Sequence, residues 1–319
     1  MLSRAFTAFF IMVAIALAWP AGAYAGPVED DALLGRWDIT ATGAKSGLPR
    51  ICWLELTRDQ GTLKGRFNEG GGAVFDLPQV MIQKGELGFQ YPHGKPPHQT
   101  PQVWQATLKD SRLVGTALTD GETLTWTGVR APVWPATPPQ RTPGKPIDLF
   151  NGKDVSGWLC QDPHHPMGWF VKDGILMNEG KNACNIYSKQ KFNDFHLEVE
   201  FNVDPQSNSG VYLRGRYEIQ ILDGYNRPLD VHSQGALYGF IVPPVKADKP
   251  AGQWQTFDIT LIANHVTVIM NGTKIIDNAE VPGITGGALD ADEAGPGPIM
   301  LQGDHGRVQF RKLHLTPLI

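Results

Sequence analysis

Residues 208–224 constrain the fold most, because their side chains alternate in character along the whole stretch. In an extended strand, successive side chains point to opposite faces. One predicted face is apolar and suits a protein core, with Val211, Leu213, Tyr217, Ile219 and Ile221. The opposite face is polar, with Asp223 at the strand end, and carries Arg214, Arg216, Glu218 and Gln220. We interpret the stretch as one strand with a functional polar face; an exposed face with a salt bridge is the alternative.

Similar alternation recurs along the rest of the chain. Residues 195–203 place apolar side chains at odd positions and polar ones at even positions, and Asn271-Gly272 is a strong hairpin turn. Hardly any segment has the 3.6-residue period of a helix. The sequence therefore predicts an all-β protein, and for residues 147–319 two sheets packed face to face.

A proline-rich stretch divides the chain. Residues 131–146 contain six prolines and predict a stiff, extended linker over 132–146. Before it, short alternating runs separated by glycine-rich turns predict a small antiparallel β domain at 26–131. That domain is expected to be a barrel or a sandwich, and its rhythm loosely resembles a lipocalin-type meander.

The N-terminus has the pattern of a secretion signal over residues 1–25. Arg4 precedes an apolar run, and Ala23-Tyr24-Ala25 gives small residues at the cleavage positions. The run is short for a bilayer span, which needs about 20 apolar residues. We expect a periplasmic or extracellular protein with no membrane span in its mature form.

Charge and cysteine content narrow the partners. The net charge of −4 and the pI of about 6.1 leave no basic excess, so a nucleic acid partner is not expected.

The cysteines are Cys52, Cys160 and Cys184. An oxidising compartment permits one disulfide, and the pair Cys160–Cys184 is favoured because both flank early strands of the second domain. Three buried thiols are the alternative.

Three further segments supply polar or aromatic groups that can join the polar face of 208–224. Residues 233–239 carry Tyr238 among glycines, and residues 252–254 carry Trp254, whose ring suits a sugar face. Residues 302–306 place Gln302, Asp304 and His305 between glycines that interrupt a strand pattern. Such an interruption is typical of a bulge that redirects side chains, and a plain polar turn is the alternative.

Ordered motifs run through residues 147–316, about half of the chain. They are Asp148–Asp154 with Ser156-Gly157-Trp158, Trp169 with Asp173–Leu176, Asn208-Ser209-Gly210 with Arg214, Glu218, Gln220 and Asp223, Gly235–Gly239, Trp254, Asn271-Gly272, Pro298–Gln302, His305-Gly306 and Phe310-Arg311. With these motifs the region resembles the 3-keto-disaccharide hydrolase domain family. Lys312 is a departure, since family members usually carry Asn after the Phe-Arg pair.

The resemblance implies a concanavalin-A-like jelly roll that acts on oxidised sugars. In this chemistry a separate sugar 3-dehydrogenase first converts the hydroxyl on carbon 3 of a glycoside to a ketone. The ketone acidifies the proton on carbon 2, so that a base removes it and the group on carbon 1 leaves. Addition of water then completes the cleavage of the 3-keto-glycoside.

The resemblance also suggests roles for individual residues. We expect Glu218 or His305 as the base, and Arg214 and Gln302 as donors to the enolate oxygen. Tyr238 or Asp304 is expected to assist the leaving group, and Trp254 to stack on the sugar. The remaining substrate-binding candidates are Asn208, Arg216, Gln220 and Asp223. A divalent cation held by Glu218, Asp223 or His305 is an alternative to the donors.

Two other functions fit the same fold. A laminarinase-type glycoside hydrolase needs two carboxylates about 5–5.5 Å apart for a retaining mechanism, whereas the residue two positions after Glu218 is the amide Gln220. A non-catalytic carbohydrate-binding module would use the same polar face without turnover. The presence of a candidate base beside two arginines favours catalysis.

Overall fold

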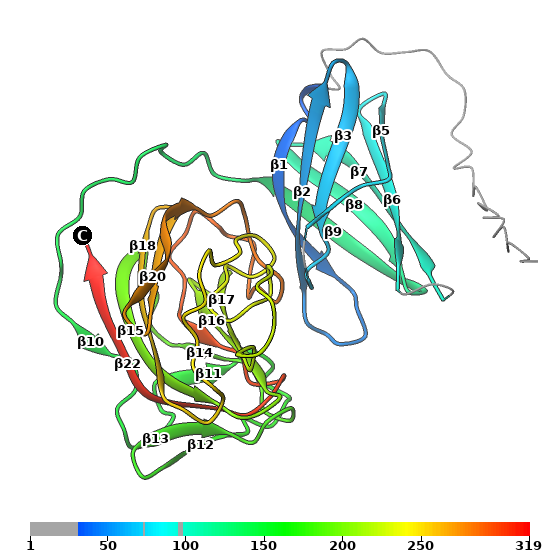
Figure 1. Ribbon diagram of the computed structural model, residues 1–319. Coiled ribbons are helices and arrows are strands. Elements are labelled where there is room, and N and C mark those ends of the chain that lie inside the picture. Colours follow the sequence, from blue (N-terminus) through cyan, green and yellow to red (C-terminus); the bar gives the residue numbers. More distant parts are fainter. Residues whose placement is uncertain (1–30, 73, 95–97) are drawn as a thin grey trace, which may run out of the picture.

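The computed structural model describes residues 31–72, 74–94 and 98–319 (Figure 1). All its regular elements are strands, and these form three sheets, which confirms the predicted all-β class. In the described ranges no helix is both long and apolar enough to span a membrane. The predicted signal peptide, residues 1–25, lies outside the described residues.

The first sheet holds nine antiparallel strands in the order β4-β3-β2-β1-β9-β8-β7-β6-β5. They are β1 (Gly35–Thr42), β2 (Arg50–Asp59), β3 (Thr62–Asn68), β4 (Phe75–Asp76), β5 (Gln79–Gln83), β6 (Glu86–His93), β7 (Thr100–Lys109), β8 (Arg112–Thr119) and β9 (Glu122–Arg130). Consecutive strands pair as in a meander except β4 and β5, which end the order on its two sides, and β1 also pairs with β9. We call this unit the N-terminal sheet. Its core contains Trp37, Phe67, Trp104 and Trp126, all buried.

The proline-rich stretch after β9 is fastened to the end of the chain. The Thr142 amide donates to the Ile319 carbonyl (2.8 Å), and the Gly144 amide donates to the Pro317 carbonyl (2.7 Å). Arg141 forms an ion pair with the buried Asp194 at 2.6 Å. The end of the stretch, residues 141–144, therefore runs along the C-terminal strand.

Residues 147–319 form two sheets. The eight-stranded sheet has the order β12-β13-β22-β15-β18-β19-β20 with β10 paired to β22, and the five-stranded sheet has the order β11-β14-β21-β16-β17. The strands are β10 (Ile147–Asp148), β11 (Trp158–Cys160), β12 (Trp169–Lys172), β13 (Ile175–Asn178), β14 (Ile186–Ser188), β15 (Asp194–Val203), β16 (Asn208–Leu213), β17 (Tyr217–Leu222), β18 (Gln255–Ile262), β19 (His265–Met270), β20 (Thr273–Glu280), β21 (Met300–Leu301) and β22 (Val308–Leu318). One apolar core joins both sheets and includes Phe201, Phe257, Val211 and Ile219. This is the face-to-face sandwich that the alternation predicts.

The prediction of a single strand over 208–224 is wrong. The stretch is a hairpin in which β16 and β17 pair antiparallel, with Leu213 opposite Tyr217. Arg214 and Gly215 turn the chain with positive φ angles of 53° and 70°. Because the turn has three residues, the alternation keeps the same parity on both sides of it. The sequence pattern therefore gives the right faces while concealing the turn.

Candidate functional site

The candidate site lies on the face of the five-stranded sheet that points away from the apolar core. In the hairpin register, Tyr212 stands opposite Glu218 and Gly210 stands opposite Gln220. A Cβ atom at Gly210 would overlap the Glu218 carboxylate. Glycine at this position therefore makes the room in which the carboxylate lies.

Glu218 is buried, with 2% of the residue exposed, and donors surround its carboxylate. The Tyr212 hydroxyl donates to Oε2 at 2.8 Å. With its amide nitrogen facing the acceptors around it, Gln220 donates to Oε1 at 3.1 Å and to the Ser209 carbonyl at 2.9 Å. The backbone amide of Glu218 donates to the Thr285 hydroxyl at 3.0 Å. The carboxylate is therefore held in one position.

The environment of Glu218 gives it the properties of a base near neutral pH. Burial, which disfavours the charged form, raises the pKa of this carboxyl to about 8, and the Asp304 carboxylate adds to the rise. The Tyr212 hydrogen bond acts in the opposite direction, because it stabilises the carboxylate. A group with such a pKa accepts and releases a proton at physiological pH.

Two more predicted residues lie beside Glu218. The Gln302 amide follows β21 and donates to the Tyr212 hydroxyl at 3.4 Å, while its backbone pairs with Gly210. The Tyr238 amide donates to the Glu218 carbonyl at 3.0 Å, so residues 235–239 run along β17. Burial raises the pKa of Tyr238, and the Glu218 carboxylate adds to this shift.

Asp304 and His305 form the exposed rim of this face. Their side chains are 44% and 52% exposed, and the His305 Nδ1 lies 2.5 Å from an Asp304 oxygen. The hydrogen bond that His305 donates to the Asp304 carboxylate raises the pKa of His305 above its usual value. The Asp304–His305 pair therefore lies at the exposed edge of this face, and the Glu218 carboxylate is buried beneath it.

The loop that carries this pair is held by two asparagines that the sequence reading missed. Asn178 donates to the carbonyls of Gly303 (2.9 Å) and Gly306 (2.8 Å). Asn185 accepts from the Gly303 amide at 2.8 Å. A Cβ at Gly303 would overlap the Cys184 carbonyl, so the glycine permits this close approach.

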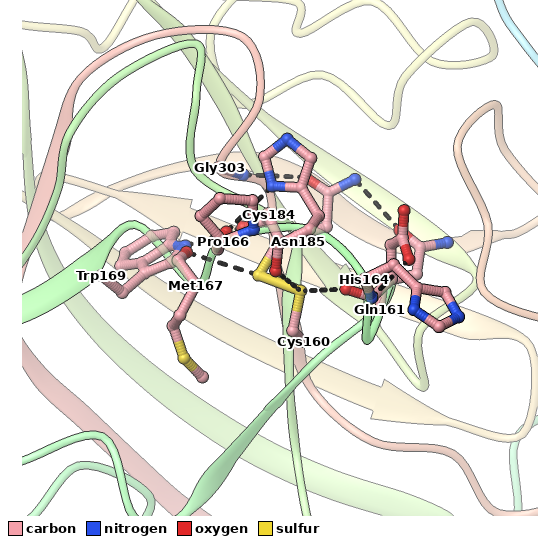
Figure 2. Close-up of a disulfide and its surroundings, with 11 residues drawn as sticks. Cys160, Gln161, His164, Pro166, Met167, Trp169, Cys184, Asn185 and Gly303 are labelled. Carbon is pink, nitrogen blue, oxygen red and sulfur yellow. Dashed lines mark hydrogen bonds between the residues drawn. A yellow bond between two sulfur atoms is a disulfide. The ribbon is translucent and has the colours of Figure 1, made fainter. Parts of the chain in front are cut away.

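Figure 2 shows the disulfide that anchors this region. Cys160 and Cys184, the favoured pair, are bonded with their Cα atoms 5.8 Å apart, and Cys52 is a buried thiol. Asn185 follows Cys184 directly and donates to Gln161, the residue after Cys160, at 3.1 Å. The cross-link therefore lies one residue away from the side chain that holds Gly303.

The two arginines predicted for the site have other partners. Arg214 donates to the Ala263 carbonyl, and its guanidinium lies 5.5 Å from the Trp134 ring centroid. Arg216 pairs with Asp290 at 2.6 Å and donates to the Gly295 carbonyl at 2.8 Å. Both groups are buried and engaged around the turn rather than hydrogen-bonded to Glu218.

Three of the substrate-binding candidates stand apart or at the edge. Trp254 directly precedes β18 of the eight-stranded sheet. The Arg311 guanidinium lies over the Trp254 ring, 4.3 Å from the ring centroid. Asp223 caps the Gln206 amide at 2.9 Å beyond the end of β17. Asn208 begins β16 on the same face as Tyr212, and it is partly buried. Of these three, Asn208 has the placement closest to the predicted one.

The predicted cation ligands are not gathered in one place. In the described part of the chain, the group of three ligand side chains within 4.8 Å of one another is His196, Glu198 and Asp258, on the eight-stranded sheet. Glu218, Asp223 and His305 are not members of such a group there. The positions of these three residues therefore do not support the alternative of a cation at the site.

Tyr212 and Thr285 also contact Glu218, and the sequence reading missed both. Tyr212 has the same parity as Glu218 in the alternating pattern, and counting along 208–224 was enough to place it on the polar face. Thr285 lies in the segment between β20 and β21, far from the hairpin in sequence, and local pattern carries no signal for it.

Comparison with known proteins identifies the class of the sandwich. A family model described as the 3-keto-alpha-glucoside-1,2-lyase-like domain matches residues 145–316. The match covers more than half of the chain, and the chain belongs to this family. A curated relative from Bacteroides thetaiotaomicron VPI-5482, named 3-keto-disaccharide hydrolase, is 24% identical over 166 residues, which are 41% of this chain and 57% of the relative.

Solved structures give weaker likenesses. A proposed glycosyl hydrolase from Parabacteroides distasonis ATCC 8503 is 30% identical with a TM-score of 0.46, covering 59% of this chain and 94% of that one. The carbohydrate-binding module CBM66 from Bacillus subtilis is 12% identical with a TM-score of 0.36, covering 50% and 95%.

Proposed function

We propose that this protein is a carbohydrate-active enzyme that cleaves 3-keto-glycosides, with Glu218 as the base. The observation that carries the proposal is the Glu218 carboxyl, which is buried, has a pKa of about 8 and is fixed by Tyr212 and Gln220. Membership in a family described as 3-keto-alpha-glucoside-1,2-lyase-like supports the proposed substrate class. The name of the Bacteroides relative is consistent with it.

The reaction is an elimination followed by hydration. Glu218 takes the proton from carbon 2, and the electrons of the broken C–H bond form the enolate with the carbon 3 ketone. The enolate then expels the oxygen on carbon 1, which is protonated by an acid. The alcohol leaves in this step, and water then adds to the resulting double bond, its oxygen to carbon 1 and a proton to carbon 2, which gives the free 3-keto sugar.

The placement of the neighbouring groups suggests their roles. Gln302 stands beside Tyr212 with an amide donor, which suits the developing enolate oxygen. Because Arg214 donates to the Ala263 carbonyl, we do not assign this role to Arg214. Tyr238 stands next to Glu218 along the sheet, and it or Asp304 would serve the leaving group. The Asp304–His305 pair at the rim would meet the substrate first.

The 3-keto group has to come from an upstream oxidation at carbon 3, so a sugar 3-dehydrogenase is the expected supplier of substrate. We place this chemistry outside the cytoplasm. The signal-like residues 1–25 and the Cys160–Cys184 disulfide support that location, because disulfides persist in oxidising compartments.

Ordinary glycoside hydrolysis is the second candidate. It requires a second carboxylate about 5–5.5 Å from the first for retention, and on the strand of Glu218 the next residue of the same face is the amide Gln220, which donates to Glu218. The carboxylate that faces Glu218 is Asp304, on the exposed loop after β21. A binding module without turnover would leave the raised pKa of Glu218 without a use. Both observations favour elimination.

The test compares a 3-keto-glucoside with its unoxidised parent, using the wild type and Glu218→Gln, with and without a chelator. Turnover of the keto substrate alone, lost in the variant, is the expected result. Cleavage of the parent would instead indicate glycoside hydrolysis, and saturable binding of either sugar without turnover would indicate a binding module. Sensitivity to the chelator would show that a cation takes part.

A further inference from the structure

The N-terminal sheet contacts the segment that covers the candidate site and forms hydrogen bonds with it. We call residues 281–298, between β20 and β21, the covering segment. The Trp53 indole nitrogen on β2 and the Asn68 amide on β3 donate to the same carbonyl, that of Ile284, at 3.0 and 3.1 Å. The Gly287 amide donates to the Gly70 carbonyl at 2.9 Å. Three hydrogen bonds between the two units therefore hold two residues of the segment, Ile284 and Gly287.

Apolar packing reinforces these bonds. A small buried cluster joins the two units and contains Ile51, Trp53, Ile284, Ala288 and Ala291. The Trp53 ring also stacks on Phe240, with centroids 6.1 Å apart. A Cβ at Gly286 would approach the backbone of residues 71 and 72 too closely, so glycine permits the contact. The interface is therefore closely packed.

A buried charge ties the same segment to the core. Glu293, which is 1% exposed, accepts from Arg36 of β1 and from the Tyr217 hydroxyl, the latter at 2.9 Å. Arg36 also donates to the Pro282 carbonyl. One carboxylate thus connects the N-terminal sheet, the covering segment and β17, the strand that carries Glu218.

The inner side of the covering segment contacts the candidate base. The Thr285 hydroxyl accepts from the Glu218 amide at 3.0 Å, and the Gly286 carbonyl lies 3.1 Å from the Tyr212 hydroxyl. That hydroxyl has one proton and two acceptors, the Glu218 carboxylate and the Gly286 carbonyl. When Glu218 is ionised, Tyr212 donates to it. When Glu218 is protonated, it can donate to Tyr212, which then turns its proton to Gly286.

From this geometry we propose that the N-terminal sheet is a positioning element for Glu218, acting through Trp53, Asn68 and Gly70 on the Gly286 carbonyl. The inference rests on the proposed role of Glu218 as the base. The Tyr212 hydroxyl can donate fully to the Gly286 carbonyl only when Glu218 is protonated, because it otherwise donates to the Glu218 carboxylate. Holding that carbonyl in place therefore favours proton uptake by Glu218 and excludes water from it.

The other titratable groups facing Glu218 come from elements outside the covering segment. They are Tyr212 on β16, Tyr238 in residues 235–239 and Asp304 after β21. A change in the titration of Glu218 on altering Trp53 or Asn68 is therefore a signature of the covering segment, because neither of these residues touches Glu218 itself.

The test uses the full chain with Trp53→Phe, which keeps a stacking ring and removes the donor, and Asn68→Ala, which adds no charge and removes both the donor to Ile284 and the acceptor for the Gly70 amide. Trp104→Phe is the matched control, because Trp104 is buried inside the N-terminal sheet and stacks on Phe89. Three readouts are taken: amide exchange at Gly287 and Glu218, carboxyl carbon NMR titration of Glu218, and the pH dependence of kcat/KM.

In Trp53→Phe and Asn68→Ala we expect faster exchange at both amides. We also expect the Glu218 titration and the kcat/KM inflection to move down by about one pH unit, the scale of one lost hydrogen bond, with neither change in Trp104→Phe. Should Trp53→Phe fail to fold, as judged by circular dichroism, Asn68→Ala decides. An unchanged titration in the folded variants overturns the proposal. If the wild type does not turn over a 3-keto-glucoside, the proposed function fails, while the NMR titration still decides the positioning claim.

Discussion

Glu218 and Glu198 both occupy polar faces of alternating strands, β17 and β15, yet their surroundings differ. Glu198 is 36% exposed and pairs with Lys312 at 2.5 Å, and the hydrogen bond from Lys312 lowers its pKa. Glu218 is buried among a tyrosine and an amide, and its pKa rises to about 8. The same sequence pattern thus produces a surface ion pair on one sheet and a candidate base on the other. The difference comes from what covers the face.

Replacing each carboxylate by its amide should give the largest contrast. Glu218→Gln keeps the shape and removes the base, so turnover of a 3-keto-glucoside is expected to fall about 10²–10⁴-fold. Glu198→Gln removes an exposed ion pair of little energetic value and should leave the rate unchanged. Steady-state kinetics of the two variants, with circular dichroism to verify folding, checks this. Equal losses in both variants would remove the distinction between the two faces.

The pH dependence of the rate should report Glu218. The base is active when ionised, so kcat/KM is expected to rise about tenfold per pH unit below the pKa and to level off above about pH 8. Glu198→Gln should keep the same profile. An inflection at pH 4–5, typical of an exposed carboxyl, would mean that Glu218 is not the titrating group or that it is not buried in solution.

Stability should also depend on pH through Glu218. Its folded pKa lies above the ordinary value of 4.5, so the folded state binds more protons between these two values and the free energy of unfolding falls as pH rises from about 4.5 to 8. The maximum slope from this group is about 1.4 kcal/mol per pH unit. Asp38, whose pKa burial and Glu293 raise to about 8, adds a slope of the same sign.

Urea unfolding across this pH range should therefore give a shallower decline for Glu218→Gln than for the wild type. Glu198→Gln serves as the control, because the lowered pKa of Glu198 acts only at the acid end, where its contribution is lost as pH falls. Identical slopes for wild type and Glu218→Gln would contradict a raised pKa in the folded state.

Alternation alone was enough to predict the all-β class. It also placed Val211 and Ile219 on the core face and Glu218 on the opposite face. It missed the turn at Arg214-Gly215 because a three-residue turn preserves parity. Side chains that look polar and available, such as Arg214, were predicted for the site, whereas the turn directs Arg214 to the Ala263 carbonyl. Local pattern assigns a face but not the partner that meets it.

The contacts that distinguish the two faces join residues far apart in the chain. Thr285 meets Glu218, Asn185 meets Gly303, and Trp53 meets Ile284 across 231 positions. Each depends on tertiary packing that a single sequence does not encode in any window. The resemblance to a known family placed Glu218 and Gln302 together, and the packing explains why the first of these has an unusual pKa.

The central claim is that Glu218 removes the proton from carbon 2, and a single-turnover isotope experiment tests it directly. A 3-keto-glucoside with hydrogen or deuterium on carbon 2 is mixed with excess wild-type enzyme at pH 7, and release of the group on carbon 1 is followed. The account predicts markedly slower release from the deuterated substrate. Equal rates for the two substrates, with the deuterium retained on carbon 2 of the product, would mean that the bond to carbon 1 breaks without proton removal and would contradict the assignment.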